Sequence, residues 1–196
     1  KLNLNKNDFV VALHGIIHPS KGYKQIFLWW KKIVKDYKNW KLLVIGGGEE
    51  ENWCRNFVRK YNLQNNIIMT GWLPTQKDVN LYLNAADCLL VTRRNTQENT
   101  GVIPSSLYHS MPLGKPTIAT GLPGMAEIIE NGISGYVFEP DNYNSFKSVL
   151  EEVYNNPKKS KQIGKNGIKR AKESFDPKLA AEKWTQVINE SLVYSH

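Results

Sequence analysis

The sequence predicts an α/β fold: a doubly wound, mostly parallel Rossmann-like sheet of about six strands, with helices on both faces and a helical C-terminal tail. Short apolar runs rich in β-branched residues alternate with segments of helical periodicity. The apolar runs are nearly continuous, which is typical of parallel strands buried on both faces. Strands that alternate with helices are joined by right-handed crossovers, so helices are expected to cover both faces.

The predicted elements follow directly from these two patterns. The strands are residues 9–13, 41–45, 67–69, 88–91, 117–119 and 135–138. Apolar residues recur at the spacing of one helix face in residues 23–37, 79–86 and 146–153. The tail, from about residue 156 to residue 196, has no strand signal, and its helical runs are predicted to break near Gly164, Gly167 and Asp176-Pro177.

Length and composition indicate one globular domain. The 196 residues are 41% hydrophobic and 22% charged, and no repeat or linker divides them. Residues 1–196 are therefore expected to form a single Rossmann-like domain. The chain begins with a lysine rather than a methionine. We expect it to be a piece of a longer protein, with the missing part before Lys1.

The apolar segments and the cysteines bear on the compartment. No apolar run approaches the length of a bilayer span, and residues 1–8 lack the apolar core of a signal peptide. Cys54 and Cys88 lie far apart inside apolar patterns, which favours reduced core thiols over a disulfide or a metal site. A cytoplasmic location is expected, and no metal site is predicted.

The chain is basic, with a formal net charge of +8. This charge suits an anionic partner: nucleotide phosphates, nucleic acid or an acidic membrane surface. Much of the excess lies in residues 158–161 and 165–172, on faces of helices that we expect to be exposed. These lysines are interpreted either as a solvated surface or as a contact for an anionic membrane.

Ligands of a doubly wound sheet bind beyond the carboxyl ends of the strands, where turns meet helix N-termini. The turn that follows the first strand is residues 14–22. Ser20 is the expected N-cap of the next helix, and Lys21 is expected in its first turn. A lysine there opposes the helix dipole unless an anion is nearby, which makes Lys21 a candidate for binding phosphate.

The turn Gly46-Gly-Gly-Glu-Glu-Glu51 looks like a phosphate loop but is not predicted to be one. Its spacing matches neither Gly-x-Gly-x-x-Gly nor the P-loop, and its glutamates would repel a diphosphate. We predict a tight turn with an acidic helix start. The missing glycine fingerprint also argues against a nicotinamide oxidoreductase.

A third turn, residues 70–75, follows the third strand. A glycine and an exposed Trp72 at a strand end can hold a nucleobase through backbone hydrogen bonds and stacking. Equally, Trp72 can cover the edge of the core. The sequence leaves both interpretations open.

The fourth turn leads into residues 104–116. Pro104 can open a helix, Ser105 and Ser106 put hydroxyls in its first turn, and Gly-Lys-Pro ends it before a buried strand. Helix N-termini of this kind bind anions. The polar loop before it contains Arg93 and Arg94, which either complete the neutralisation of a bound anion or lie in solvent.

These segments resemble the C-terminal, nucleotide-sugar-binding domain of GT-B glycosyltransferases of the family 4 (group 1) type. Residues 15–22 are similar to that family's G-R-L-x-x-x-K-G turn, and residues 43–49 to its L-x-I-V-G-x-G turn. Further similarities are residues 68–73 to V-x-F-x-G-x-V, 81–87 to L-Y-x-x-A-D, 107–116 to L-x-E-A-M-A-x-G-x-P, 123–129 to G-G-x-x-E-I-I and 131–137 to N-G-x-T-G-x-L. The resemblance covers nearly the whole chain.

The resemblance implies the donor-binding half of a retaining, metal-independent glycosyltransferase of polysaccharide biosynthesis. Such an enzyme moves a hexose from a nucleoside diphosphate sugar to a glycan or lipid-linked acceptor. The absence of an Asp-x-Asp pair here is compatible with metal independence. The resemblance further implies no cofactor, no nucleic-acid partner, and an N-terminal acceptor domain of the same protein, without which this domain is inactive. A lipid-linked acceptor would place the protein at the inner face of an anionic membrane.

The resemblance also assigns binding residues, although no catalytic residue. Lys21 corresponds to the family's phosphate-binding lysine. Taken together, the residue patterns and the resemblance predict that Gly15, Lys21, Trp72, Gly101, Pro104, Ser105, Ser106 and His109 bind the nucleotide sugar, with Arg93 and Arg94 as possible contacts of the diphosphate.

Three positions depart from the family pattern. The family's phosphate-binding arginine falls at Ile16, which carries no charge, and its pair of glutamates falls at Gly101 and His109. The second glutamate ordinarily accepts hydrogen bonds from the donor ribose, and a neutral histidine accepts more weakly than a carboxylate. Glu98 could supply the first carboxylate from a shifted loop.

Two hypotheses follow. In the first, the chain is the donor-binding half of an active glycosyltransferase. In the second, it is a glycosyltransferase-like domain that has lost donor chemistry and serves as a binding or partner module. The lost charges favour the second, whereas Lys21, the Pro104 turn and the complete set of strands favour the first.

Overall fold

The computed structural model describes residues 2–193 and contains a six-stranded, wholly parallel sheet with strand order β3-β2-β1-β4-β5-β6. The strands are β1 Phe9–His14, β2 Trp40–Ile45, β3 Ile67–Met69, β4 Cys88–Val91, β5 Thr117–Thr120 and β6 Tyr136–Phe138. The predicted fold class is confirmed, and each predicted strand is found to within one residue at either end. The strand order reverses between β1 and β4, which is where ligands bind in doubly wound folds.

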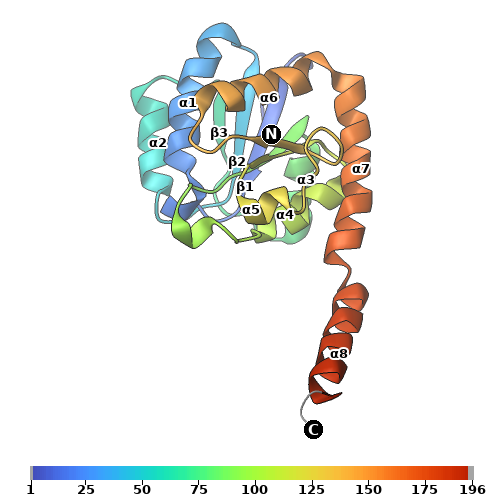
Figure 1. Cartoon of the computed structure of the whole chain (residues 1–196). Helices are drawn as coiled ribbons and strands as arrows, with labels where there is room; N and C mark the ends of the chain where they lie inside the picture. The colour runs from blue at the N-terminus through green and yellow to red at the C-terminus, as the bar shows by residue number, and fades with distance from the viewer. Residues whose placement is uncertain (1, 194–196) are drawn as a thin grey trace.

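Eight helices and three short 3-10 turns connect the strands and extend beyond them within the described part of the chain. The helices are α1 Tyr23–Asp36, α2 Glu51–Lys60, α3 Gln76–Asn84, α4 Ser105–Ser110, α5 Pro123–Ala126, α6 Tyr143–Asn155, α7 Pro157–Phe175 and α8 Pro177–Val193. The 3-10 turns are η1 Pro19–Lys21, η2 Gln97–Asn99 and η3 Met111–Leu113. Figure 1 shows α1 and α2 side by side at one side of the sheet and α7 at the opposite side.

Both faces of the sheet are buried, and β1 shows how. Phe9, Val11 and Leu13 pack into a core cluster with residues of α1, α2 and α6, whereas Val10 and Ala12 pack into a second cluster with α3. Successive side chains of a strand point to opposite faces, so a continuous apolar run is what a sheet covered on both sides requires. Each buried large apolar side chain stabilises the fold by about 1.5–3 kcal/mol relative to exposure. The carboxyl ends of the central strands are therefore held by packing on two sides.

Helix α1 begins later than predicted. Residues 19–21 form η1, and Gly22, with a φ of 74°, is the N-cap of α1. The prediction that Ser20 caps this helix is wrong because the left-handed conformation at Gly22 interrupts the helical path. Lys21 accordingly ends η1 and lies just before α1 rather than in its first turn.

The predicted breaks at Gly164 and Gly167 are also wrong, because α7 runs continuously through both. A Cβ at Gly164 would lie 2.3 Å from the carbonyl oxygen of Gly114, and one at Gly167 would lie 2.9 Å from that of Ser134. These glycines thus allow close backbone approach instead of ending the helix. The break at Asp176-Pro177 is confirmed, and Figure 1 shows α8 projecting away from the sheet beyond it.

Two further observations concern the cysteines and the apolar content of the helices. Cys54 and Cys88 are free and buried, as predicted, and burial raises the pKa of the Cys54 thiol to about 12. Among residues 2–193 there is no helix with both the length and the apolar composition to cross a bilayer.

Candidate functional site

A crevice of about 330 Å³ lies at the carboxyl ends of β1 and β2, between the segment that follows β3 and helix α4. It brings together residues from four separate turns of the chain. Of the residues predicted to bind the nucleotide sugar, those lining it are Gly15, Lys21, Trp72, Ser105, Ser106 and His109. It lies where a doubly wound fold places its ligand.

Four predicted residues do not line the crevice. Pro104 is buried as the N-cap of α4, and Arg94 is exposed in the loop that follows β4. Gly101 is exposed, and its backbone packs against the start of α5. A Cβ at Gly124 would lie 2.7 Å from the Gly101 carbonyl. Arg93 is partly buried and bonds to Asn99, and its charge contributes to lowering the pKa of Lys21, after burial. The assignments of all these residues to a bound donor stay predictions.

The turns after β1 and β2 are packed backbone against backbone. A Cβ at Gly46 would lie 2.1 Å from the carbonyl oxygen of Gly15, and Gly46 has a φ of 131°. The amide of Ile17 donates to the carbonyl of Gly47 at 2.9 Å. The three-glycine turn therefore allows two turns to approach each other closely.

Two of the three glutamates in this turn form ion pairs with basic side chains of the neighbouring helices. Glu50 is buried and pairs with Lys24 at 2.8 Å, and Glu51 pairs with Arg55 at 2.7 Å. No aspartate or glutamate is among the residues that line the crevice in the described part of the chain. An anion entering the crevice consequently meets no carboxylate on its walls.

Trp72 forms one wall and is 64% exposed. Its indole lies over the glycine turn, since a Cβ at Gly47 would be 2.8 Å from Trp72 Nε1. The residue thus contacts the β2 turn and keeps most of its surface in solvent. Such a ring has an apolar face available for stacking.

His14 ends β1 and is buried at the base of the crevice. Its Nε2 lies 3.3 Å from the carbonyl oxygen of Ser106 and 3.2 Å from Ser110 Oγ. Only a protonated ring nitrogen can bond to a carbonyl, so these contacts select the tautomer that carries hydrogen on Nε2. Burial lowers the pKa of His14 to about 4, and the charges of His109 and Lys21 act in the same direction.

Helix α4 carries the opposite wall. It has only six residues before η3 and the left-handed Gly114 end it. Ser106 is buried, whereas His109 is exposed, with its ring edge-on to that of His14 at 6.2 Å between centroids. Two imidazoles therefore lie close to each other at this wall of the crevice.

Lys21 supplies positive charge to the crevice. It is partly buried, and burial lowers its pKa, with Arg93 as the second cause. A group of three or more His, Cys, Asp or Glu side chains able to hold a metal is absent from residues 2–193. The charge available to a ligand here is that of basic side chains.

Sequence reasoning missed two residues. His14 is the last residue of β1, and its place at a strand end was a usable signal. Asn99 is buried in an otherwise polar loop and bonds to Arg93, and nothing local in the sequence distinguishes it from the exposed polar residues around it.

Fold and crevice together define a class: a Rossmann-like domain with a crevice at the carboxyl ends of its central strands. Residues 1–170 match the family described as glycosyl transferases group 1, so the chain belongs to that family, as its C-terminal-type domain. The resemblance seen in the sequence is confirmed.

Individual relatives are distant. An uncharacterized glycosyltransferase of Haemophilus influenzae is 22% identical over 96% of this chain and 51% of its own length. The capsular polysaccharide biosynthesis glycosyltransferase CapM of Staphylococcus aureus is 27% identical over 95% of this chain and 47% of its own. The chain thus spans about half the length of these relatives.

Among solved structures, Anabaena Alr3699/HepE in complex with UDP and glucose superimposes with a TM-score of 0.77. The match covers 93% of this chain and 48% of the Anabaena chain at 19% identity. At that identity the likeness shows the fold alone.

Proposed function

We propose that this chain is the donor-binding half of a glycosyltransferase that moves a hexose from a nucleoside diphosphate sugar to a glycan or lipid-linked acceptor. The observation that carries the proposal is the crevice itself, which gathers Gly15, Lys21, Trp72 and the start of α4 at the carboxyl ends of the central strands and, within residues 2–193, has no carboxylate among its lining side chains. Membership of the family and the UDP complex of the Anabaena neighbour support it. An acceptor domain elsewhere in the same protein would complete the enzyme.

The proposed chemistry is retaining and independent of metal. The bond between the anomeric carbon and the diphosphate oxygen breaks, and its electron pair passes to the diphosphate. The hydroxyl oxygen of the acceptor bonds to the anomeric carbon on the same face, and its proton passes to the departing diphosphate. Positive side chains and N–H donors placed at the diphosphate stabilise that charge more as it develops, which is what lowers the barrier. Lys21 is proposed to act in this way on the leaving group.

The second candidate is a domain that has lost donor chemistry and serves as a binding module. Ile16, which is 47% exposed, offers no charge, and Gly101 and His109 replace two carboxylates. A module of this kind would keep the fold and fail to bind nucleotide sugars.

Titration calorimetry with UDP, GDP and their sugars separates the two candidates. The donor-binding proposal predicts saturable binding of at least one of these nucleotides. No heat with any of them at millimolar concentration would contradict it and favour the binding module.

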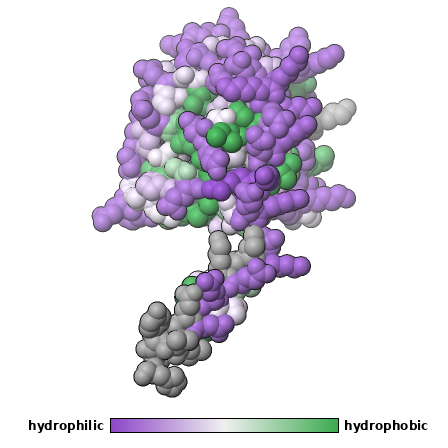
Figure 2. Space-filling view, turned by 45° about the vertical axis from the view of Figure 1, so that its right-hand side comes forward, coloured by the Kyte–Doolittle hydropathy of each residue, from purple (hydrophilic) through white to green (hydrophobic). Residues whose placement is uncertain are grey.

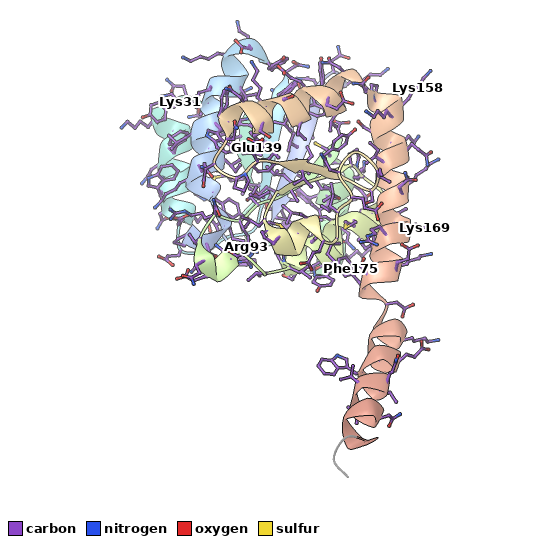
Figure 3. The ribbon with its side chains drawn as sticks, in the orientation of Figure 1. Lys31, Arg93, Glu139, Lys158, Lys169 and Phe175 are labelled. Carbon is purple, nitrogen blue, oxygen red and sulfur yellow. The ribbon has the colours of Figure 1, made fainter. Side chains whose placement is uncertain are left out.

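A membrane contact is a finer part of the proposal. Lys158, Lys161, Lys165, Lys169 and Lys172, here called the lysine face, are exposed and lie within an arc of about 80° on α7. Figure 3 shows Lys158 and Lys169 projecting outward from this helix, and Figure 2 shows hydrophilic side chains over much of the surface turned toward the viewer. We propose that this face lies on anionic lipid and holds the protein at the inner surface of a membrane.

A further inference from the structure

Lys21, which lines the crevice, and Arg93, which does not, come from two loops that are hydrogen-bonded to each other. Lys21 ends η1, and Arg93 follows β4. Burial lowers the pKa of both groups, and each is partly buried. Within the part of the chain that the structure describes, neither has a carboxylate at ion-pair distance, although seven other lysines and arginines do.

Asn99 fixes the position of Arg93. Arg93 Nη1 donates to Asn99 Oδ1 at 2.8 Å. The Asn99 amide nitrogen donates in turn to the carbonyl oxygens of Ser20 at 3.3 Å and Arg94 at 3.1 Å and to Thr96 Oγ1 at 2.9 Å. Because the amide nitrogen is committed to these acceptors, the oxygen of this buried side chain is left to face the guanidinium.

Hydrogen bonds also join the loop that follows β4 to the turn that follows β1. Thr92 Oγ1 donates to the carbonyl of Lys21 at 2.7 Å, and the Arg94 amide donates to the carbonyl of Ser20 at 2.9 Å. With the bond from Asn99, three hydrogen bonds join the loop after β4 to the turn after β1. Lys21 and Arg93 are therefore held near each other by the fold.

Holding two like charges together, partly out of water, costs free energy unless an anion lies between or beside them. Arg93 retains unsatisfied hydrogen-bonding capacity, since its Nε is buried and has no hydrogen-bond partner among residues 2–193. An arginine carries five N–H donors in a planar fork that suits phosphate oxygens. The arrangement therefore has the features of an anion-binding site: two cations are held in place, and no carboxylate of residues 2–193 pairs with them.

Neighbouring residues make poorer candidates. Arg94 is exposed and bonds through its backbone, and Ile16, where the family has its phosphate-binding arginine, is apolar. Helix α4 is too short to provide much more than its first amides. Lys21 alone would leave a diphosphate with an uncompensated charge.

We propose that Arg93, positioned by Asn99, joins Lys21 in binding the donor diphosphate and supplies the charge that Ile16 lacks. This inference rests on the proposed function and deepens it. Arg93 is a binding residue in this account, whereas Asn99 acts through Arg93 and is a positioning residue. Figure 3 shows Arg93 on the same side of the domain as α4 and α5.

The test compares adjacent arginines by calorimetric titration of the chain with UDP. Arg93→Gln is expected to weaken UDP binding by about tenfold or more, as for the loss of a charge-assisted contact. Arg94→Gln is the matched control, with the same charge change one residue away, and is expected to stay within about twofold. Equal weakening by both would overturn the inference in favour of a diffuse electrostatic effect.

The role of Asn99 is tested by a double-mutant cycle. Asn99→Ser is expected to weaken UDP binding in the unsubstituted chain and to add little in the Arg93→Gln background. Independent, additive losses would contradict a role through Arg93. Arg93→Lys, which keeps the charge, should bind UDP better than Arg93→Gln, and thermal unfolding of every variant checks that the fold is kept.

The outcomes distinguish this inference from the function on which it rests. Binding of UDP by the unsubstituted chain with no loss in Arg93→Gln would overturn the role of Arg93 and leave the donor site standing. Failure of the unsubstituted chain to bind UDP or GDP would contradict the donor site and the role of Arg93 together.

Discussion

Positive charge occurs in two different physical states in this domain. Beside the crevice, Lys21 and Arg93 are partly buried and tied to backbone and amide groups. Along α7, the lysine face is exposed on the side opposite Ile163, Gly164 and Gly167, which are buried. In the first region the guanidinium of Arg93 is held by Asn99 before any ligand arrives, whereas the second region leaves its charges hydrated on long side chains.

The difference shows why net charge is a poor guide to a binding site. Six lysines, one arginine and one glutamate give α7 a net charge of +6, out of +8 for the chain. Charges in water are screened over about 10 Å at 0.1 M salt, so they attract any polyanion weakly. Two partly desolvated cations at a strand end can select one anion.

The largest expected effect is on the pH dependence of stability, through His14, which burial in the crevice keeps neutral. His14 has a pKa of about 4, below the ordinary value of 6.5, because burial disfavours its charged form. The unfolded chain therefore binds this proton at higher pH, and the stability that neutral His14 contributes is lost as pH falls from about 6.5 toward 4. Between pH 7 and pH 4 the loss should be about 3 kcal/mol.

Urea unfolding at a series of pH values measures this loss. His14→Gln keeps a hydrogen-bond donor and cannot titrate, so its stability should fall less over the same interval. Parallel curves for the two proteins would show that His14 contributes nothing to the pH dependence.

The next effect separates the two charged regions directly. Lys21→Ala should weaken UDP binding by about 1–3 kcal/mol, since it removes a partly buried charge-assisted contact. Lys165→Ala, which removes the same charge from the lysine face, should leave the affinity unchanged. An unchanged affinity in Lys21→Ala would remove Lys21 from the site.

The smallest effect on the domain itself is expected on α7. We consider the variant in which Lys158, Lys161, Lys165 and Lys172 are replaced by glutamine. These side chains are exposed and have no ion pair within residues 2–193. The free energy of unfolding should therefore change by less than about 1 kcal/mol, and UDP binding should stay intact.

The same variant should lose binding to vesicles that contain phosphatidylglycerol, and raising the salt concentration should weaken binding of the unsubstituted chain. Vesicles of phosphatidylcholine alone are the control. Undiminished binding of the variant to anionic vesicles would contradict a membrane role for the lysine face.

The sequence was sufficient for the sheet and for most of the crevice. Continuous apolar runs predict strands buried on both faces, and the turns after β1, β3 and β4 could be placed at one edge from topology alone. Lys21, Trp72 and His109 then meet in the crevice because their turns do.

The features that escaped prediction depend on contacts distant in sequence. Gly164 lies within α7, at a point where the backbone of Gly114 comes too close for a Cβ. Nothing in the neighbouring sequence indicates that approach. Likewise, Asn99 is buried because its amide reaches Ser20 in another loop. Local propensity predicts that a loop will be polar. Contacts with residues distant in sequence determine which of its polar side chains is buried and which stays in solvent.

The most direct test of the account is to map where UDP binds along the chain. Backbone amide chemical shifts, recorded while UDP is added at near-physiological salt, should change at residues 14–22, 71–76 and 93–109 and stay constant along α7. Shift changes along α7 without changes at the crevice would contradict the distinction between the two charged regions, and no change anywhere at millimolar UDP or GDP would contradict the donor site.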